Sequence, residues 1–207
     1  LTQKLILTTL NGRYHHTSLA LRYLLANFKH PNIVAETLEF TIEDSLQLVT
    51  EKLLSQAPNY LGFSVSIWNV TQTLELLKIL KTIRPYIKII LGGPEFATQS
   101  ASHALAPYAD FIIEGEGEKT LNEILDRIEN SEQKIWNSPP LELAEIKLPY
   151  ELYSDEDLKN RFVYVETSRG CPYRCAFCLS ALSPQVRFFP LDKVFAEFST
   201  LIARGAK

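Results

Sequence analysis

The sequence predicts an α/β fold in which a five-stranded, doubly wound parallel sheet precedes the start of a second βα unit. Short apolar runs rich in β-branched residues alternate with amphipathic stretches of helical period, and the strands recur about every 25 residues. Strands that alternate with helices in this way favour a parallel sheet with helices on both faces. At 207 residues and 46% hydrophobic content, the chain is long enough to bury such a core.

The five strands are expected at residues 4–10, 33–40, 60–66, 87–91 and 110–113. Thr17 or Ser18 is the expected cap of the first helix, and Asp44 or Ser45 is that of the second. The remaining helices are expected at residues 70–83, 95–105 and 118–128. Together these elements would make one complete domain over residues 1–130.

After residue 130 the hydrophobic period fades, and three prolines (139, 140 and 149) indicate an ordered connector over residues 131–160. A strand is expected at 161–167. The cysteines follow it, and then a helix at 190–203 that Gly205 ends. A single βα unit cannot bury its own faces, so the second domain, residues 161–207, is expected to be incomplete.

The three cysteines of the chain, Cys171, Cys175 and Cys178, lie within eight residues in a C-x3-C-x2-C pattern. Thiolates are soft ligands that suit zinc and iron–sulfur clusters. A closed structural zinc site needs four ligands, and no histidine lies within sixty residues of this motif. The spacing therefore favours a [4Fe–4S] cluster in which protein thiolates hold three irons and the fourth stays open. A partial zinc site and three unrelated buried cysteines are the alternatives.

Glycines and hydroxyl residues gather where the predicted strands end. Ligands of doubly wound sheets bind outside these carboxyl ends, where glycine lets a flat ligand approach the backbone and hydroxyls bond its polar edge. The expected ligand residues are Thr9, Leu10, Asn11, Ser64, Val65, Ser66, Gly92, Gly93, Pro94, Glu114, Gly115, Glu116 and Gly117. The alternative is that βα turns need such residues for their own conformation. A nicotinamide site is disfavoured, because the first turn lacks G-x-G-x-x-G and the last turn is acidic.

Composition and charge narrow the classes of partner. The net charge is −3, and the chain has no run of Lys or Arg, so nucleic-acid binding is not expected. Arg169 and Arg174, beside the cysteines, are expected on the surface. No apolar segment is long enough to span a bilayer, and the first ten residues lack the form of a secretory signal. Since every thiol belongs to the candidate cluster, a reducing cytoplasm is the expected compartment.

Three segments match the cobalamin-binding-domain radical SAM proteins in order and at ordinary spacing, and the chain resembles that family. They are LGGPEFA (91–97), DFIIEGEGE (110–118) and SRGCPYRCAFC (168–178). Residues 6–24 and 62–69 resemble more specifically a subgroup that carries a C-terminal domain of unknown function. The resemblance implies a Rossmann- or flavodoxin-like cobalamin-binding domain followed by a radical SAM barrel, and it makes cobalamin the ligand of the edge residues given above.

By the same resemblance, Cys171, Cys175 and Cys178 ligate three irons, S-adenosylmethionine chelates the fourth, and Phe177 packs beside the adenine. The reduced cluster would cleave S-adenosylmethionine to a 5′-deoxyadenosyl radical, and an electron donor such as flavodoxin or ferredoxin would reduce it. None of the four histidines lies in a D-x-H-x-x-G motif, so no protein imidazole is expected on the cobalt.

Several functions of the whole protein stay open at this point. The resemblance favours a cobalamin-dependent methyltransferase or related C–C bond former, whose substrate no residue pattern specifies. The alternatives are a radical SAM enzyme whose first domain only docks, and a non-enzymatic cofactor sensor. Methylthiotransferases carry three further cysteines in their first domain, and residues 1–170 have none, so that branch is not expected. Because most of a barrel would lie beyond residue 207, this chain alone is expected to be inactive toward S-adenosylmethionine.

Overall fold

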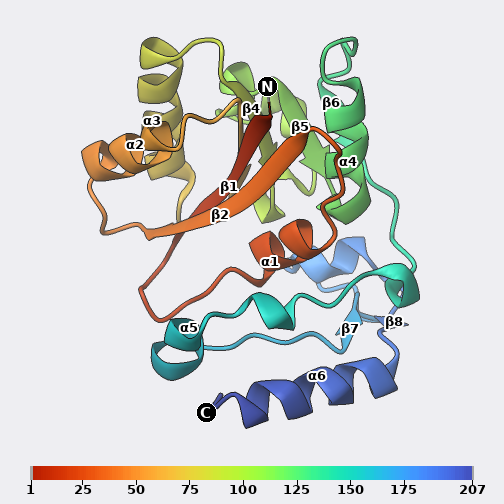
Figure 1. Cartoon of the computed structure of the whole chain (residues 1–207). Coiled ribbons are helices and arrows are strands. Elements are labelled where there is room, and N and C mark those ends of the chain that lie inside the picture. The colour runs from red at the N-terminus through yellow and green to blue at the C-terminus, as the bar shows by residue number, and fades with distance from the viewer. Residues whose placement is uncertain (1, 207) are drawn as a thin grey trace.

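The structure, a computed structural model that describes residues 2–206, is built on a six-stranded parallel sheet (Figure 1). The strands are β1 (Gln3–Asn11), β2 (Ile33–Thr41), β3 (Tyr60–Ser64), β4 (Lys88–Gly92), β5 (Phe111–Glu114) and β6 (Ile135–Asn137). Their order in the sheet is β2-β1-β3-β4-β5-β6, so the direction of winding reverses between β1 and β3. The predicted doubly wound parallel sheet is confirmed, with one strand more than expected.

The additional strand is β6, which lies within residues expected to form the connector. Ile135, Trp136 and Asn137 pair in parallel with Ile112, Ile113 and Glu114 of β5, and Trp136 is buried against the sheet. Three residues are too few for an alternating pattern to be recognised in the sequence. The sheet therefore continues past the five strands that periodicity alone indicates.

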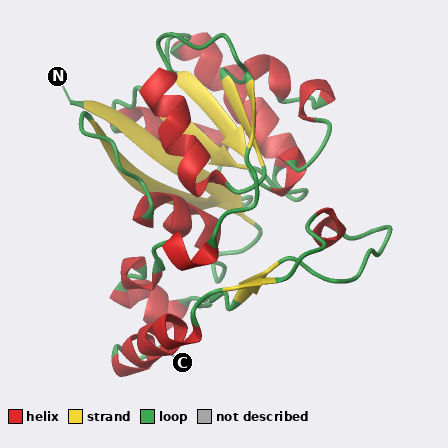
Figure 2. Ribbon diagram, turned by 90° about the vertical axis from the view of Figure 1, so that its right-hand side faces the viewer, coloured by secondary structure: helices red, strands yellow, loops and turns green. Residues whose placement is uncertain are grey.

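Helices cover both faces of the sheet (Figures 1 and 2). α1 (Leu19–Ala26) and α4 (Gly117–Arg127) pack on one face, and α2 (Leu46–Ser55) and α3 (Val70–Ile83) pack on the other. The hydroxyls of Ser18 and Ser45 accept hydrogen bonds from the N–H groups of Leu21 and Leu48, at 3.3 and 3.2 Å. Of the two candidates for each cap, the serine is the one that caps the helix.

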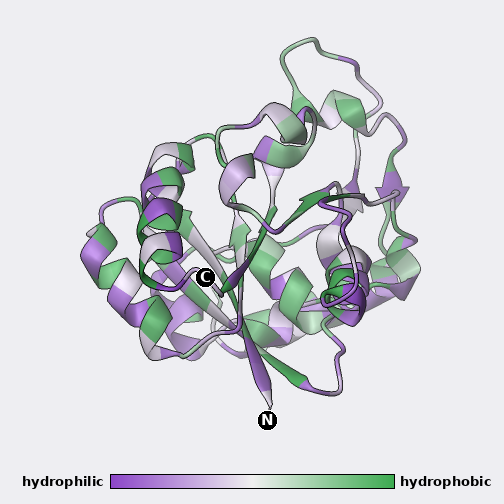
Figure 3. Cartoon of the chain, turned by 90° about the horizontal axis from the view of Figure 1, so that it is seen from above, coloured by the Kyte–Doolittle hydropathy of each residue, from purple (hydrophilic) through white to green (hydrophobic). Residues whose placement is uncertain are grey.

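Side-chain alternation along β1 divides the core into two layers. Ile6 and Leu10 pack toward α2 and α3, whereas Leu5 and Leu7 pack toward α1 and α4, as the two-residue period of a strand requires. All four side chains are at most 1% exposed. In Figure 3 hydrophobic stretches occur along the strands of the sheet, and the surrounding helices carry hydrophobic and hydrophilic residues in alternation.

The prediction of a helix at residues 95–105 is wrong. Three short 3₁₀ turns stand there instead, Pro94–Phe96, Ser100–Ser102 and Ala106–Tyr108. Gln99 adopts a left-handed backbone with φ of 56°, which a right-handed helix cannot continue through. The apolar spacing in this segment arises because Phe96, Leu105 and Ala106 reach the core from separate turns.

The prediction of a strand at 161–167 is also wrong. Tyrosine hydroxyls, and not a neighbouring strand, make hydrogen bonds with the backbone of this segment. The Tyr153 hydroxyl donates to the Tyr164 carbonyl (2.8 Å) and accepts from the Tyr164 N–H (2.9 Å). The Tyr150 hydroxyl does the same for Glu166, at 3.1 and 2.8 Å. Buried backbone groups need partners, and here hydroxyls supply them, so the segment is extended without belonging to a sheet.

The C-terminal part packs beneath α1 through a third cluster of buried residues. It contains α5 (Asp155–Asn160), the short antiparallel hairpin of β7 (Ser168–Arg169) and β8 (Arg187–Phe188), and α6 (Leu191–Ala203). Tyr23 of α1 joins Tyr150, Phe189, Val194 and Leu201 in this cluster. The helix expected at 190–203 is confirmed as α6, and Gly205, with φ of 93°, follows its end. Within residues 2–206, no helix is long and apolar enough to cross a membrane.

Candidate functional site

Two adjoining cavities open at the carboxyl edge of the sheet. The apolar cavity, of about 280 Å³, lies over β3, β4 and β5 between α1 and α4. The polar cavity, of about 600 Å³, lies over the ends of β1 and β3. Both are lined by Leu19, Ala20 and Ser64, so they meet at the point where the winding of the sheet reverses. Doubly wound sheets bind their ligands at this point.

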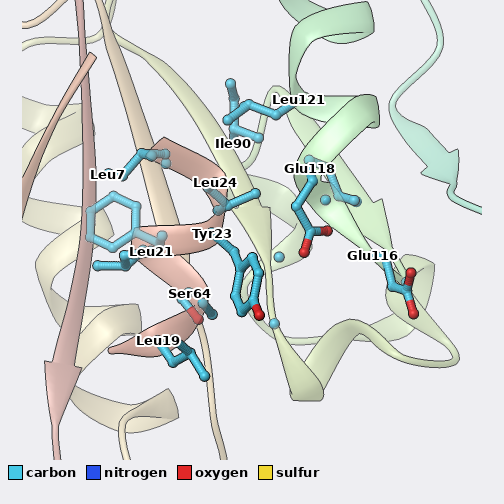
Figure 4. A pocket seen from close by; sticks show the side chains of 18 of the residues that line it. Leu7, Leu19, Leu21, Tyr23, Leu24, Ser64, Ile90, Glu116, Glu118 and Leu121 are labelled. Carbon is cyan, nitrogen blue, oxygen red and sulfur yellow. The ribbon is translucent and has the colours of Figure 1, made fainter. Parts of the chain in front are cut away.

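Several glycines line the apolar cavity where it meets the sheet and the start of α4. Figure 4 shows the leucines of α1 on one side and Leu121 and Glu118 of α4 on the other. A Cβ at Gly62 would lie 2.8 Å from a methyl group of Leu7, and one at Gly117 would lie 2.9 Å from a methyl group of Leu24. Larger residues at either position would occupy the space between the two helices.

The polar cavity is lined by hydroxyl, amide and aromatic side chains. Thr9, Ser64 and Ser66 come from the ends of β1 and β3, and Trp68 stands at the rim with 54% of its surface exposed. His16 also lines this cavity, where its Nδ1 lies 2.5 Å from the Tyr164 hydroxyl. These groups can donate and accept hydrogen bonds around a large, partly polar ligand.

Asn69, which no sequence pattern had singled out, holds the ends of β1 and β3 together. Its Nδ2 donates to the Leu10 carbonyl at 3.0 Å and lies 3.3 Å from the Thr9 hydroxyl. Its Oδ1 accepts from the Ser66 N–H at 2.9 Å. The side chain is fully buried, so each of these bonds fixes the floor of the polar cavity in a low-dielectric setting.

Two glycines in left-handed conformations shape the neighbouring turns. Gly93 has φ of 102°, and a Cβ there would lie 2.6 Å from the Val65 carbonyl oxygen. Gly115 has φ of 97°, and its Cβ would lie 2.7 Å from the Ser138 carbonyl oxygen. Only glycine fits such positions without strain. Both residues also line the apolar cavity. The same two glycines therefore allow the turn conformation and leave room for a ligand.

The structure brings most of the predicted edge residues to the two cavities. The lining includes Thr9, Asn11, Ser64, Ser66, Gly92, Gly93, Pro94, Gly115, Glu116 and Gly117. Leu10 and Val65 are fully buried among core residues on the α2 and α3 side, and Glu114 accepts from the Ser100 N–H at 3.4 Å. Strand alternation, applied residue by residue, separates these three from their neighbours.

Five charged side chains, which we call the rim cluster, border or support the apolar cavity. They are Glu116, Glu118, Glu166, Arg169 and Arg187, and all except Arg187 line the cavity itself. Arg169 donates to Glu118 at 2.6 Å and to Glu166 at 3.1 Å, and its Nη1 lies 3.4 Å from Glu116. Arg187 donates to both oxygens of Glu116 and to the Leu141 carbonyl.

The rim cluster corrects two expectations. Arg169, expected on the surface, has only 13% of its side chain exposed, and its guanidinium lies 4.8 Å above the Tyr23 ring. The acidic loop after β5 is neutralised by arginines that lie far away in sequence, so its charge does not face the cavity unpaired. No local pattern predicts such a pairing, because Arg169 follows Glu118 by 51 residues.

Two carboxyl groups of the rim cluster have pKa values shifted in opposite directions. Burial opposes the charged form of Glu116, but hydrogen bonds from Arg187 and the Leu141 N–H outweigh it, so its pKa is lowered. Burial dominates at Glu166 and raises its pKa, although Arg169 acts in the other direction. Perturbed carboxyl groups at the mouth of a cavity mark a candidate functional site.

Comparison with known proteins identifies the fold and its ligand class. The family model described as the B12 binding domain matches residues 4–125. The chain belongs to the B12-binding domain family. The structure of apo, SeMet-labeled cobalamin-dependent S-adenosylmethionine radical enzyme OxsB covers 99% of this chain and shares its fold, with a TM-score of 0.71 at 18% identity. This chain corresponds to 32% of that enzyme.

Curated relatives of this B12-binding domain protein are methyltransferases and radical SAM enzymes. An uncharacterized methyltransferase of Pyrococcus horikoshii is 29% identical over 70% of this chain and 37% of its own length. The cobalamin-dependent radical SAM methyltransferase TokK of Streptomyces tokunonensis is 25% identical over 58% of this chain and 22% of its own. The ribosomal protein uS12 methylthiotransferase RimO of Chlamydia felis is 31% identical over 64% and 28%. The chain thus spans well under half of each of these relatives.

Beyond the B12-binding domain, the cysteines occupy what we call the cysteine loop, residues 170–186, between β7 and β8. In Figure 2 the loop extends away from the body of the molecule beside this hairpin. Cys175 and Cys178 are exposed, Cys171 is half-buried, and Phe177 is 93% exposed. The Cys178 N–H donates to the Cys175 carbonyl at 3.0 Å. Within residues 2–206, no three His, Cys, Asp or Glu side chains gather closely enough to hold a metal.

Proposed function

We propose that this chain binds cobalamin at the carboxyl edge of its sheet and forms part of a cobalamin-dependent radical SAM methyltransferase. One observation carries the proposal: a broad polar cavity joins an apolar cavity lined in part by glycines at the switch point of a B12-binding domain. The methyltransferase class is supported by what the names of two relatives state. Supply of electrons by a flavodoxin or ferredoxin belongs to the same proposal.

The shapes of the two cavities suit the two parts of cobalamin. The cofactor is a flat macrocycle edged with amides and carries a nucleotide arm that ends in a heteroaromatic base. Thr9, Ser64 and Ser66 would hydrogen-bond the amides in the polar cavity. The apolar cavity, at about 280 Å³, would receive the base among leucine and isoleucine side chains. When bound, cobalamin supplies a transferable methyl group.

The donor chemistry of the cysteine loop suits an iron–sulfur cluster. Cys171, Cys175 and Cys178 would each supply one thiolate, and the exposure of Cys175 and Cys178 leaves them accessible to incoming iron. Cys178 has a lowered pKa because backbone and hydroxyl groups of Ser180 hydrogen-bond its thiolate, which favours the form that ligates metal. When bound, the cluster supplies the electron that cleaves S-adenosylmethionine.

The test of the cobalamin proposal is equilibrium dialysis of the purified chain against cyanocobalamin, whose cobalt is already occupied and does not react readily with the exposed thiols. We expect one equivalent to bind at micromolar concentrations. Replacement of Gly117 by Leu should weaken binding about tenfold or more, equivalent to about 1.4 kcal/mol, because the added side chain projects between α1 and α4. Lys119→Leu is the matched control, since it adds the same side chain to an exposed position of α4.

Each outcome of the dialysis separates the proposed functions. If the unmodified chain binds no cyanocobalamin at micromolar concentrations, the proposal fails and a docking role of the first domain is favoured. If Gly117→Leu and Lys119→Leu bind equally well, cobalamin does not use the apolar cavity. The iron–sulfur part is tested separately by anaerobic reconstitution with iron and sulfide. Four irons per chain are expected, and their retention after all three cysteines are replaced by alanine would contradict the assignment.

A further inference from the structure

We propose that Arg169 is a positioning residue that couples occupancy of the apolar cavity to the position of the cysteine loop. The inference rests on the proposed function, because cobalamin is the occupant we assign to the cavity. Arg169 is suited to this role by its place in the chain: its side chain lines the cavity, and Cys171 lies two residues further along. One residue therefore belongs to both sites.

The guanidinium of Arg169 contacts carboxylates and an aromatic ring. Its Nη2 donates to Glu118 of α4 at 2.6 Å, and its Nε donates to Glu166 at 3.1 Å. Its guanidinium carbon, Cζ, lies 4.8 Å from the centre of the Tyr23 ring of α1. The rigid fork of an arginine can satisfy such a set of partners in one orientation only. Hence α1 and α4, the two walls of the cavity, together determine where the backbone of β7 lies.

The other strand of the hairpin is held at the same place. Arg187 of β8 pairs with Arg169 of β7 in the antiparallel ladder, and both side chains reach the carboxylate of Glu116. The two ends of the cysteine loop are therefore fixed to one acidic group on the cavity rim. Within the loop, the Cys171 N–H donates to the Ser183 carbonyl at 3.0 Å, and a Cβ at Gly170 would lie 2.2 Å from the Gln185 carbonyl oxygen. This close packing transmits the position of the hairpin to Cys171.

Filling the cavity should strengthen these contacts. Solvent that enters the cavity would screen the ion pairs that Arg169 makes with Glu118 and Glu166. A ligand that displaces this solvent lowers the local dielectric, and paired charges then attract each other more strongly. Coupling between two sites is reciprocal. Bound cobalamin should therefore hold the hairpin in place, and a cysteine loop held in place should raise the affinity of the chain for cobalamin.

The experiment measures hydrogen–deuterium exchange of peptides from residues 166–189, in the full chain, with and without saturating cyanocobalamin. In the unmodified chain we expect the ligand to slow exchange about fivefold or more, at the lower end of ordinary coupling between sites. In Arg169→Gln the slowing at saturating ligand should fall below about twofold, and dialysis should show cyanocobalamin binding weakened up to about fivefold, because the coupling is reciprocal. Arg84→Gln, at the exposed end of α3, is the matched control and should behave like the unmodified chain.

A structural role alone would raise exchange in Arg169→Gln but keep the ligand-dependent slowing, and that result would overturn the proposal. Slowing that is absent from the unmodified chain, although cyanocobalamin binds to it, would overturn the proposal as well. Failure of the unmodified chain to bind cyanocobalamin would instead refute the proposed function. If Arg169→Gln does not fold, Arg169→Lys replaces it. A lysine keeps the charge but cannot make the three-way contact, so the slowing should be reduced there too.

Discussion

Replacement of Asn69 by Ala tests whether the switch point of the sheet depends on one buried amide. The change removes the acceptor of the Ser66 N–H and the donor to the Leu10 carbonyl, at a position with no solvent exposure. A buried polar group left without a partner costs about 1–3 kcal/mol, and each ordinary hydrogen bond contributes about 1 kcal/mol. We therefore expect a loss of about 2–4 kcal/mol in the free energy of unfolding, a large share of the stability of an ordinary domain.

The assay is equilibrium unfolding in urea, followed by circular dichroism. With a slope of about 2 kcal/mol per molar urea, the midpoint should fall by about 1–2 M. Asn32→Ala is the matched control, because Asn32 is exposed, and it should change stability by less than about 0.5 kcal/mol. A loss below about 1 kcal/mol in Asn69→Ala would show that water or a relaxed backbone replaces the amide, and the reasoning would be refuted. Ser66 lines the polar cavity, so cyanocobalamin binding should weaken in the same variant.

Two further predictions concern stability. Gly93→Ala should destabilise the fold by about 2 kcal/mol or more in urea, because its φ of 102° and the Val65 backbone both exclude a Cβ. Gly12→Ala, where a Cβ meets nothing within 4 Å, is its control, and equal midpoints for the two would contradict the argument. At Asp110, burial alone would raise the pKa, but hydrogen bonds from Lys81 and the Ile89 N–H outweigh it and lower the pKa. The stability that this carboxylate contributes is therefore complete above the usual value of 3.8 and is lost as the pH falls through the lower folded value. Asp110→Asn should accordingly be less stable than the unmodified chain at pH 7, with a gap that narrows in acid; a gap of constant size would exclude this linkage.

Local patterns in the sequence were sufficient where one element depends on its own residues. The alternation of strands and helices predicted the doubly wound sheet, and single segments narrowed each of the first two helix caps to two residues and gave the bounds of α3. The serines after β3 and the glycines after β4 and β5 predicted a ligand site at the carboxyl edge of the sheet, and the two cavities open at that edge. Leu10 and Val65 were predicted to belong to that edge as well, but their side chains pack among core residues on the α2 and α3 side.

In two segments the local pattern of residues did not decide the local structure. Residues 161–167 have the composition of a strand, but the hydroxyls of Tyr150 and Tyr153 take their hydrogen bonds. Residues 95–105 have helical spacing, but the left-handed Gln99 divides them into separate turns. Contacts from other residues in the first segment, and a left-handed backbone at one residue in the second, outweigh a weak intrinsic propensity.

The sequence by itself therefore determined the fold class, the sheet edge proposed to bind a ligand, and a set of thiols with the chemistry of an iron–sulfur ligand. Only the tertiary structure decided how these parts are connected. Arg169 reaches Glu118 across 51 residues, and Arg187 reaches Glu116 across 71. Such pairs form because burial makes an unpaired charge too costly to tolerate. Which charges are buried depends on the packing of α1, α4 and the β7–β8 hairpin, and no spacing along the chain records that packing.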